Sequence, residues 1–204
     1  MSATVGDVPV GNAYDKEATT NPIERRMVNG FTAGLRSLLP SSPANVLEVG
    51  CGEGGQLRKI GDALPGAHLV GIDLPHPDLA ERWRGLDSEM VCASALTLPF
   101  PDRSFDLVLA LEVLEHLDDP EAALAEIARV GRDTVVLSVP WEPWWRAGNL
   151  ARGRYVRDFG NTPGHLQHWG RRRFLRTVGR HLQVDAVRRP VPWTMVRARV
   201  SNHR

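Results

Sequence analysis

The chain has few cysteines and no long apolar run, and both absences narrow its class. Cys51 and Cys92 are the only cysteines among 204 residues, and neither their number nor their spacing suggests a disulfide framework or a zinc site. No apolar stretch approaches the roughly 18 residues of a membrane helix. The N-terminus lacks the basic segment and apolar core of a secretory signal. With 42% hydrophobic residues the chain is not of a disordered class, so we expect one compact domain in a reducing, cytoplasmic setting.

The net charge of +1 conceals an uneven distribution. Residues 146–204 contain 14 Arg and two acids, whereas residues 1–145 contain 11 basic and 22 acidic residues. A basic segment can attract an anionic ligand or nucleic acid, or it can balance the acidic part within the monomer or across a dimer. We favour charge balance, within the monomer or across a dimer. We expect no nucleic-acid partner, because no aromatic residues alternate regularly with the arginines around 171–180.

Strands alternate with helices along the chain. Apolar residues at helical spacing and their flanking caps predict helices, and short apolar runs predict strands. Near-continuous apolar strands between helices indicate a parallel sheet that is covered on both faces. The last two strands are predicted to form an antiparallel pair. The predicted helices are 22–40, 56–64, 77–86, 120–130 and 171–178, and the predicted strands are 46–49, 68–73, 90–93, 105–111, 134–139, 182–187 and 195–200.

A glycine-rich segment, residues 50–55, follows the first strand and opens a helix. Glycine permits a tight turn and a close approach of the backbone to a ligand. The same letters fit the dinucleotide fingerprint, so the loop alone does not choose the cofactor. Glu48 would repel a pyrophosphate and suits a ligand that presents an ammonium group. Asp73, at the end of the second strand, can accept hydrogen bonds from both hydroxyls of a ribose.

Four segments in this order resemble class I S-adenosylmethionine-dependent methyltransferases. Residues 46–55 and 70–73 are similar to the first two motifs of that family, and residues 98–106 and 111–117 are similar to its small-molecule branch, the methyltransferase type 11 group. The resemblance implies a Rossmann-like α/β fold. Its doubly wound sheet would have seven strands, mostly parallel, with an antiparallel C-terminal hairpin. It also implies S-adenosyl-L-methionine as cofactor and S-adenosyl-L-homocysteine as product.

The resemblance also implies where the cofactor lies. Its methionine end would be surrounded by the glycine loop, its ribose would meet the acid after the second strand, and its methyl group would face Leu111. Ser94 stands where the family usually has an Asp that contacts the adenine amine. The expected cofactor-binding residues are Glu48, Gly50, Cys51, Gly52, Asp73, Leu74, Ser94, Ala95 and Leu111.

Three candidate catalytic residues, Glu112, Glu115 and His116, follow the fourth strand. Open α/β sheets bind ligands at this carboxyl end. Methyl transfer needs proximity, a desolvated site and sometimes a base to free the nucleophile. His116 is the candidate base because an imidazole titrates near neutrality. The alternative is that His116 only packs the following turn.

The same residues with His165 could bind a divalent metal. This arrangement resembles metal-dependent small-RNA 2′-O-methyltransferases, in which a Glu-x-x-Glu-His run is joined by a histidine four residues before a tryptophan, as His165 precedes Trp169. Carboxylate and imidazole ligands suit magnesium, manganese or similar ions, which would acidify an acceptor hydroxyl. The Glu-His run also occurs in related enzymes without a metal, so the sequence alone assigns no metal ligand.

We expect a single methyltransferase domain over residues 1–204. Its expected parts are an arm and cap helix (1–43), a cofactor-binding core (44–139), a substrate-side insert (140–170) and a C-terminal helix and hairpin (171–204). An insert of this length is typical of lids and binding elements. Its tryptophans, with Trp169, could form a wall against a flat or apolar substrate or anchor a long loop on the core.

The predicted function is S-adenosylmethionine-dependent methylation of a small molecule, with oxygen as the first choice of accepting atom. A non-methylating use of the fold, as a cyclase or a regulatory subunit, is one alternative. An NAD-dependent oxidoreductase is another, although Glu48 and the lack of an evident hydride-transfer partner count against it. The expected state is a monomer or homodimer with no membrane contact.

Overall fold

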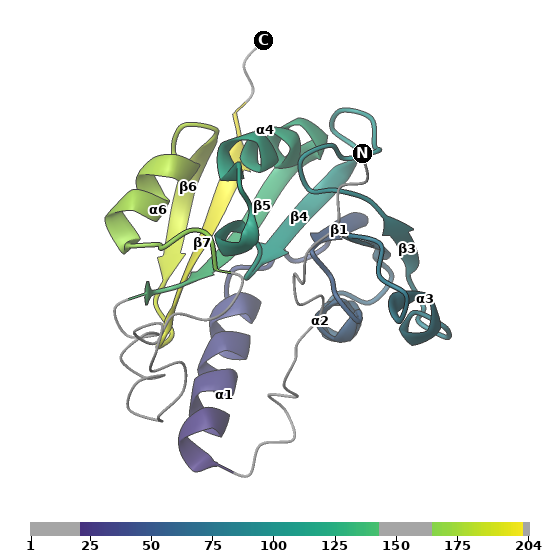
Figure 1. Cartoon of the computed structure of the whole chain (residues 1–204), viewed down its shortest axis with the longest axis horizontal. Helices are drawn as coiled ribbons and strands as arrows, with labels where there is room; N and C mark the ends of the chain where they lie inside the picture. The colour runs from purple at the N-terminus through teal and green to yellow at the C-terminus, as the bar shows by residue number, and fades with distance from the viewer. Residues whose placement is uncertain (1–20, 143–164, 202–204) are drawn as a thin grey trace, which may run out of the picture.

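The computed structural model describes residues 21–142 and 165–201 and contains one seven-stranded sheet (Figure 1). Its strand order is β3-β2-β1-β4-β5-β7-β6. The first five strands pair in parallel, and β7 runs antiparallel to both of its neighbours. The predicted α/β fold and its antiparallel C-terminal pair are therefore confirmed. The strands are β1 Asn45–Val49, β2 His68–Asp73, β3 Glu89–Cys92, β4 Phe105–Leu111, β5 Gly131–Pro140, β6 Leu182–Arg188 and β7 Trp193–Val200.

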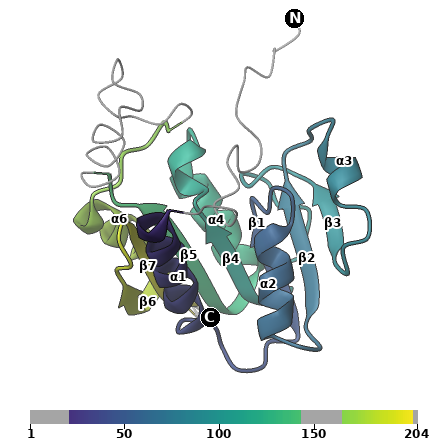
Figure 2. The ribbon, with the colours of Figure 1, turned by 90° about the horizontal axis from the view of Figure 1, so that it is seen from below.

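Helices cover both faces of the sheet (Figures 1 and 2). The helices α1 (Pro22–Arg36) and α2 (Gly55–Ala63) pack on one face, and α4 (Pro120–Val130) and α6 (Arg171–Val178) pack on the other. Strand β4 serves both cores, because alternate side chains of a strand point to opposite faces. Within β4, one core takes Leu107 and Leu109, and the other takes Val108 and Ala110.

Two helices begin as their sequences predict. The Asn21 side chain accepts a hydrogen bond from the Ile23 N–H and caps α1, and Asp119 caps α4 by accepting from the Ala122 N–H. Proline occupies the first position of each helix, where its missing N–H costs no helical hydrogen bond. None of the helices in the described ranges is both long and apolar enough to cross a membrane.

Three predicted elements differ from the structure by three residues or more at one end. The helix predicted over 77–86 is one short helix, α3 (Leu79–Arg82), and a turn that includes Gly85 at φ +79° follows it. Helix α1 ends at Arg36 rather than near Pro40. The fifth strand begins at Gly131, three residues before the predicted start.

The tryptophans of the insert are only partly described. Trp169 is 1% exposed and packs edge-on against Phe174 of α6, so it belongs to the core. Trp141 lies half-buried under the guanidinium of Arg171, 3.5 Å from the ring centroid. Residues 143–164, which contain Trp144 and Trp145, and the arm 1–20 lie outside the described residues, so the predicted roles of these segments stay predictions.

Candidate active site

The glycine loop after β1 is tied to the next strand and to the segment after β4. The N–H groups of Gly50 and Cys51 both donate to the carbonyl of Ile72 in β2, at 2.8 and 2.9 Å. Gly50 has φ +72°, and a Cβ there would overlap Cγ2 of Val113. Glycine is therefore required at this position both by its backbone conformation and by the close approach of Val113.

Asp73, at the end of β2, faces the glycine loop. Its carboxylate accepts a hydrogen bond from the Gly52 N–H at 2.6 Å with one oxygen and from the Leu74 N–H at 2.7 Å with the other. Each carboxylate oxygen has two acceptor sites, so both retain capacity for a further donor. A fixed carboxylate with spare acceptor capacity is what the pair of hydroxyls on a ribose needs.

Glu48 is a buried carboxyl group beneath this loop. Its side chain is 2% exposed. Burial, and secondly the charge of Asp73, raise its pKa to about 8. One of its oxygens, Oε2, has no hydrogen-bond partner within the described part of the chain. An ammonium group would satisfy that oxygen and stabilise the ionised form, so Glu48 and the loop fit the amino-acid end of S-adenosylmethionine. Burial likewise raises the pKa of the neighbouring Cys51 thiol, which stays neutral.

Sequence reasoning missed two residues, at the end of α3 and just after it, that contact the glycine loop. The indole N–H of Trp83 donates to the Gly52 carbonyl at 2.8 Å, and Arg82 forms an ion pair with Glu53. No spacing in the sequence signals this contact.

The predicted adenine side is formed by the turn after β3. The hydroxyl of Ser94 accepts from the Leu96 N–H at 3.2 Å, so it stabilises this turn, and Ala95 packs against the core. Leu74, predicted beside the adenine, is 41% exposed. The structure thus holds these residues at one edge of the sheet, and their contact with an adenine stays a prediction.

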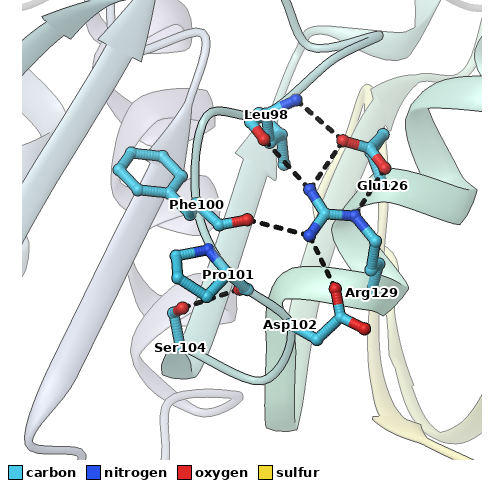
Figure 3. A network of polar contacts seen from close by, with 7 residues as sticks. All are labelled: Leu98, Phe100, Pro101, Asp102, Ser104, Glu126 and Arg129. Carbon is cyan, nitrogen blue, oxygen red and sulfur yellow. Dashed lines mark hydrogen bonds and ion pairs between the residues drawn. The ribbon is translucent and has the colours of Figure 1, made fainter.

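A polar network on α4 fixes the segment that follows this turn (Figure 3). The guanidinium of Arg129 donates to the carbonyls of Leu98 and Phe100 at 3.0 and 2.8 Å, and it also bonds the carboxylates of Glu126 and Asp102. Glu126 in turn accepts from the Leu98 N–H at 2.8 Å. The two carboxylates raise the pKa of Arg129. The planar fork of one arginine therefore clamps the loop between β3 and β4 to the body of the domain.

Imidazole and carboxylate groups gather beyond the carboxyl end of β4. The 3-10 helix η1 (Leu114–His116) carries Glu115, which is 1% exposed, and His116, which is half-buried. One ligand-type atom from each of Glu115, His116 and His165 lies within 4.8 Å of the other two. The rings of His116 and His165 meet edge to face, with centroids 4.9 Å apart. We call these three residues the Glu-His-His cluster.

Backbone hydrogen bonds hold the distant histidine in this cluster. The N–H groups of Leu166 and Gln167 both donate to the carbonyl of Glu115, at 2.8 and 2.9 Å. The amide of the Gln167 side chain also donates to the Leu117 carbonyl at 3.3 Å. The segment after residue 164 is therefore docked on η1, and the convergence of Glu115, His116 and His165 that the spacing suggested is present in the structure.

Glu112 does not join them. It adopts a left-handed backbone conformation with φ +60°, and its carboxylate accepts from the indole N–H of Trp193 at 2.6 Å and from the hydroxyl of Ser138 at 3.0 Å. These partners lie on β7 and β5. Glu112 therefore lies outside the group formed by Glu115, His116 and His165, and its predicted catalytic role stays a prediction.

Glu142 is the member of the site that sequence reasoning missed. Its Oε1 lies 3.1 Å from Nδ1 of His165, and both side chains are 6% exposed. Its Oε2 lies 3.7 Å from Nδ1 of His168. An acid two residues beyond a parallel strand was the available signal, since the ends of neighbouring parallel strands share one edge of the sheet.

These features share one architecture. The glycine loop after β1, the acid at the end of β2 and the Glu-His-His cluster after β4 all lie at the carboxyl ends of parallel strands in a sheet of order 3-2-1-4-5-7-6. This sheet and loop define the class I S-adenosylmethionine-dependent methyltransferase fold, whose cofactor is S-adenosyl-L-methionine.

Comparisons with known proteins agree with this class. Residues 47–139, a little under half of the chain, match the family described as a methyltransferase domain. A demethylmenaquinone methyltransferase of Thermus thermophilus is 36% identical over 127 residues, which are 58% of this chain and 58% of that protein. Other relatives are named as O-, N- and C-methyltransferases, among them a probable tocopherol O-methyltransferase of rice, an ajmaline N-methyltransferase of Rauvolfia serpentina and a rice sterol C-methyltransferase. The chain spans between about a quarter and three fifths of the length of these relatives.

Two solved structures have the same fold. A methyltransferase of Aquifex aeolicus that depends on S-adenosylmethionine aligns with a TM-score of 0.67 at 17% identity, over 89% of this chain and 94% of that one. The cyclase SpnF aligns with a TM-score of 0.64 at 15% identity, over 92% and 84% of the two chains.

Proposed function

We propose that this protein transfers the methyl group of S-adenosylmethionine to an oxygen atom of a small-molecule acceptor. The observation that carries the proposal is the juxtaposition of two features. The Glu-His-His cluster begins two residues after Val113, and Val113 itself packs on Gly50 of the glycine loop. A group that removes a proton is thereby held beside the loop that fits the methionine end of the cofactor.

In this proposal each part of the site has one task. Glu48 and the glycine loop hold the amino-acid end, Asp73 holds the ribose, and Leu111 lines the methyl-transfer face. When bound, the cofactor supplies an electrophilic methyl group: the acceptor oxygen bonds to it as the carbon–sulfur bond breaks, and sulfur keeps the electron pair. The hydroxyl proton leaves at the Glu-His-His cluster, where His116 is the predicted base. Glu112, held by Trp193 and Ser138, fixes the turn that leads from β4 to the cluster.

Oxygen is proposed from the chemistry of the cluster and not from the relatives. Their names include transfer to oxygen, nitrogen and carbon. A neutral amine already has a free electron pair, whereas a hydroxyl gains most of its nucleophilicity when its proton is removed. An imidazole beside a buried carboxylate therefore supports an acceptor that must lose a proton.

Calorimetric titration of the purified chain tests the cofactor first. We expect S-adenosylhomocysteine to bind with micromolar affinity and NAD not to compete with it. Release of S-adenosylhomocysteine is then measured with hydroxylated aromatic compounds and with their amino analogues. The proposal predicts turnover of the hydroxyl series, lost by at least 100-fold in His116→Gln with cofactor affinity unchanged. Turnover of the amino series alone would overturn the choice of oxygen.

The second candidate is a protein that binds the cofactor without transferring its methyl group. The similarity of the fold to a cyclase favours this candidate, since that structure aligns over 92% of the chain. It predicts tight binding of S-adenosylhomocysteine with no methylated product from any acceptor that binds to the protein. The titration and the turnover assay together separate the two candidates.

A further inference from the structure

The Glu-His-His cluster has the composition of a metal-ion site. It offers one carboxylate and two imidazoles from two segments 49 residues apart in the chain, and their ligand atoms lie within 4.8 Å of one another. Ligands bonded to one divalent ion at about 2.1 Å are roughly 3.4 Å apart in a tetrahedron and about 4.2 Å apart across an octahedron. The observed limit of 4.8 Å is therefore within about 0.6 Å of the octahedral separation.

A buried carboxylate orients one of the two imidazoles. Oε1 of Glu142 accepts from Nδ1 of His165 at 3.1 Å, which assigns the proton to Nδ1 and leaves the lone pair on Nε2. Histidines that bind metals have this arrangement, in which the second ring nitrogen donates to a carboxylate or carbonyl. The pair is 6% exposed on both sides and is further fixed by the hydrogen bonds from the next two residues to the Glu115 carbonyl. A histidine that only packed a turn would need no such partner.

From this geometry we propose that Glu115, His116 and His165 bind one divalent transition-metal ion, with Glu142 positioning His165. Two imidazoles favour zinc, cobalt or iron over magnesium and calcium, which prefer oxygen ligands. Three protein ligands leave at least one coordination position open, as in catalytic metal sites. With the ion bound, His116 would act as a ligand in place of the base assigned above. The ion would hold the acceptor hydroxyl at the open position and acidify it, so that its proton could leave to solvent. The role of the ion rests on the proposed methyl transfer, but its binding does not.

Titration of the metal-free chain with Co²⁺ tests the site without any acceptor. Bound Co²⁺ is detected by its visible absorption, and we expect saturation at one ion per chain with micromolar affinity. Zn²⁺ should abolish this absorption, and a large excess of Mg²⁺ should leave it unchanged. Binding of S-adenosylhomocysteine is measured on the same samples. Cofactor binding without Co²⁺ binding overturns the metal site alone, whereas Co²⁺ binding without cofactor binding overturns the proposed function alone.

Variants separate this site from adventitious binding. His165→Gln should weaken Co²⁺ binding by at least 100-fold, and Glu142→Gln by about 10- to 100-fold. The matched control is His181→Gln, because His181 also pairs with a carboxylate, Glu121, at 2.6 Å but lies outside the cluster. It should bind Co²⁺ like the parent. Far-ultraviolet circular dichroism checks folding, and if His165→Gln unfolds, His116→Gln takes its place. Equal Co²⁺ affinity in the parent and in a folded cluster variant would overturn the proposal.

Discussion

At the scale of single residues, the most consequential group is one neutral carboxyl. Glu48 is buried and has a pKa of about 8, so it carries its proton at pH 7 in the cofactor-free protein. In the unfolded chain a glutamate has a pKa of about 4.3. The folded state therefore binds one proton more than the unfolded state between these two values.

The pH dependence of stability follows from this difference. The contribution of Glu48 to the free energy of unfolding is largest below about pH 4.3. It declines as the pH rises, by up to about 1.4 kcal/mol per pH unit, and becomes constant above about pH 8. Glu48→Gln removes this decline. The free energy of unfolding of the variant, relative to that of the parent, should therefore rise by a few kcal/mol from pH 5 to pH 8. Urea unfolding without ligand measures this difference.

The exposed Glu81→Gln, which lies on α3, is the control and should follow the parent curve. Parallel curves for Glu48→Gln and the parent would show that Glu48 is ionised in the folded protein. If Glu48 faces the ammonium group of the cofactor, binding of S-adenosylhomocysteine at pH 7 should also release a proton, measurable as a binding enthalpy that changes with the ionisation heat of the buffer.

The residue scale also marks where sequence reasoning stops. The positions of Glu48, Gly50 and Asp73 followed from their places next to strand ends. The partners of Glu112 and His165 did not, because Trp193 lies in β7 and Glu142 lies just after β5. These contacts depend on which strands are neighbours in space, and the order of elements along the chain does not contain that information.

At the scale of elements, apolar periodicity predicted almost every helix and strand. The exceptions were α3, which has four residues where ten were predicted, and the 3-10 helix η1, which was not predicted. Apolar patterns indicate which residues are buried against the sheet. They do not predict a hydrogen bond such as the one from the Trp83 indole to the glycine loop.

The loop between β3 and β4 depends on one arginine of α4. Arg129→Lys should lower the free energy of unfolding by about 1–3 kcal/mol, because a lysine cannot reproduce the bidentate fork and leaves backbone carbonyls without their donor. Urea unfolding measures this loss, and hydrogen exchange should show faster exchange of the Leu98 N–H. Cofactor affinity should also fall several-fold, since this loop continues the predicted adenine side.

Arg176→Lys is the control for that change. Arg176 is exposed on α6, and its replacement should alter stability by less than about 0.5 kcal/mol. An equally small effect at Arg129 would mean that water replaces the hydrogen bonds of its guanidinium with no loss of stability.

At the scale of the whole molecule, opposite charges meet across the sheet. Residues 165–201 contain nine arginines and one acid, whereas residues 21–142 contain ten basic and nineteen acidic residues. The contacts between β5 and β7 and ion pairs such as Arg180–Glu121 join these two parts. The expected balance of charge within the monomer is consistent with this arrangement.

Added salt should therefore lower the stability of the folded protein. Raising NaCl from about 20 to 200 mM shortens the Debye length from roughly 20 Å to 7 Å. We expect the melting temperature to fall by a few degrees, measured by differential scanning calorimetry. The double variant Arg172→Gln, Arg176→Gln removes two exposed charges of α6 and should reduce this dependence. A melting temperature that rises with NaCl over this range would contradict the attraction.

The position of β7 has a consequence for how the chain is made. Strand β6 is synthesised before β7 but, among the described strands, pairs only with β7, which lies between it and β5. While residues up to Arg188 emerge from the ribosome, β5 is an open edge and β6 has no strand to pair with, a condition that favours association between nascent chains. The sheet closes, and Trp193 reaches Glu112, only after the last strand has been released.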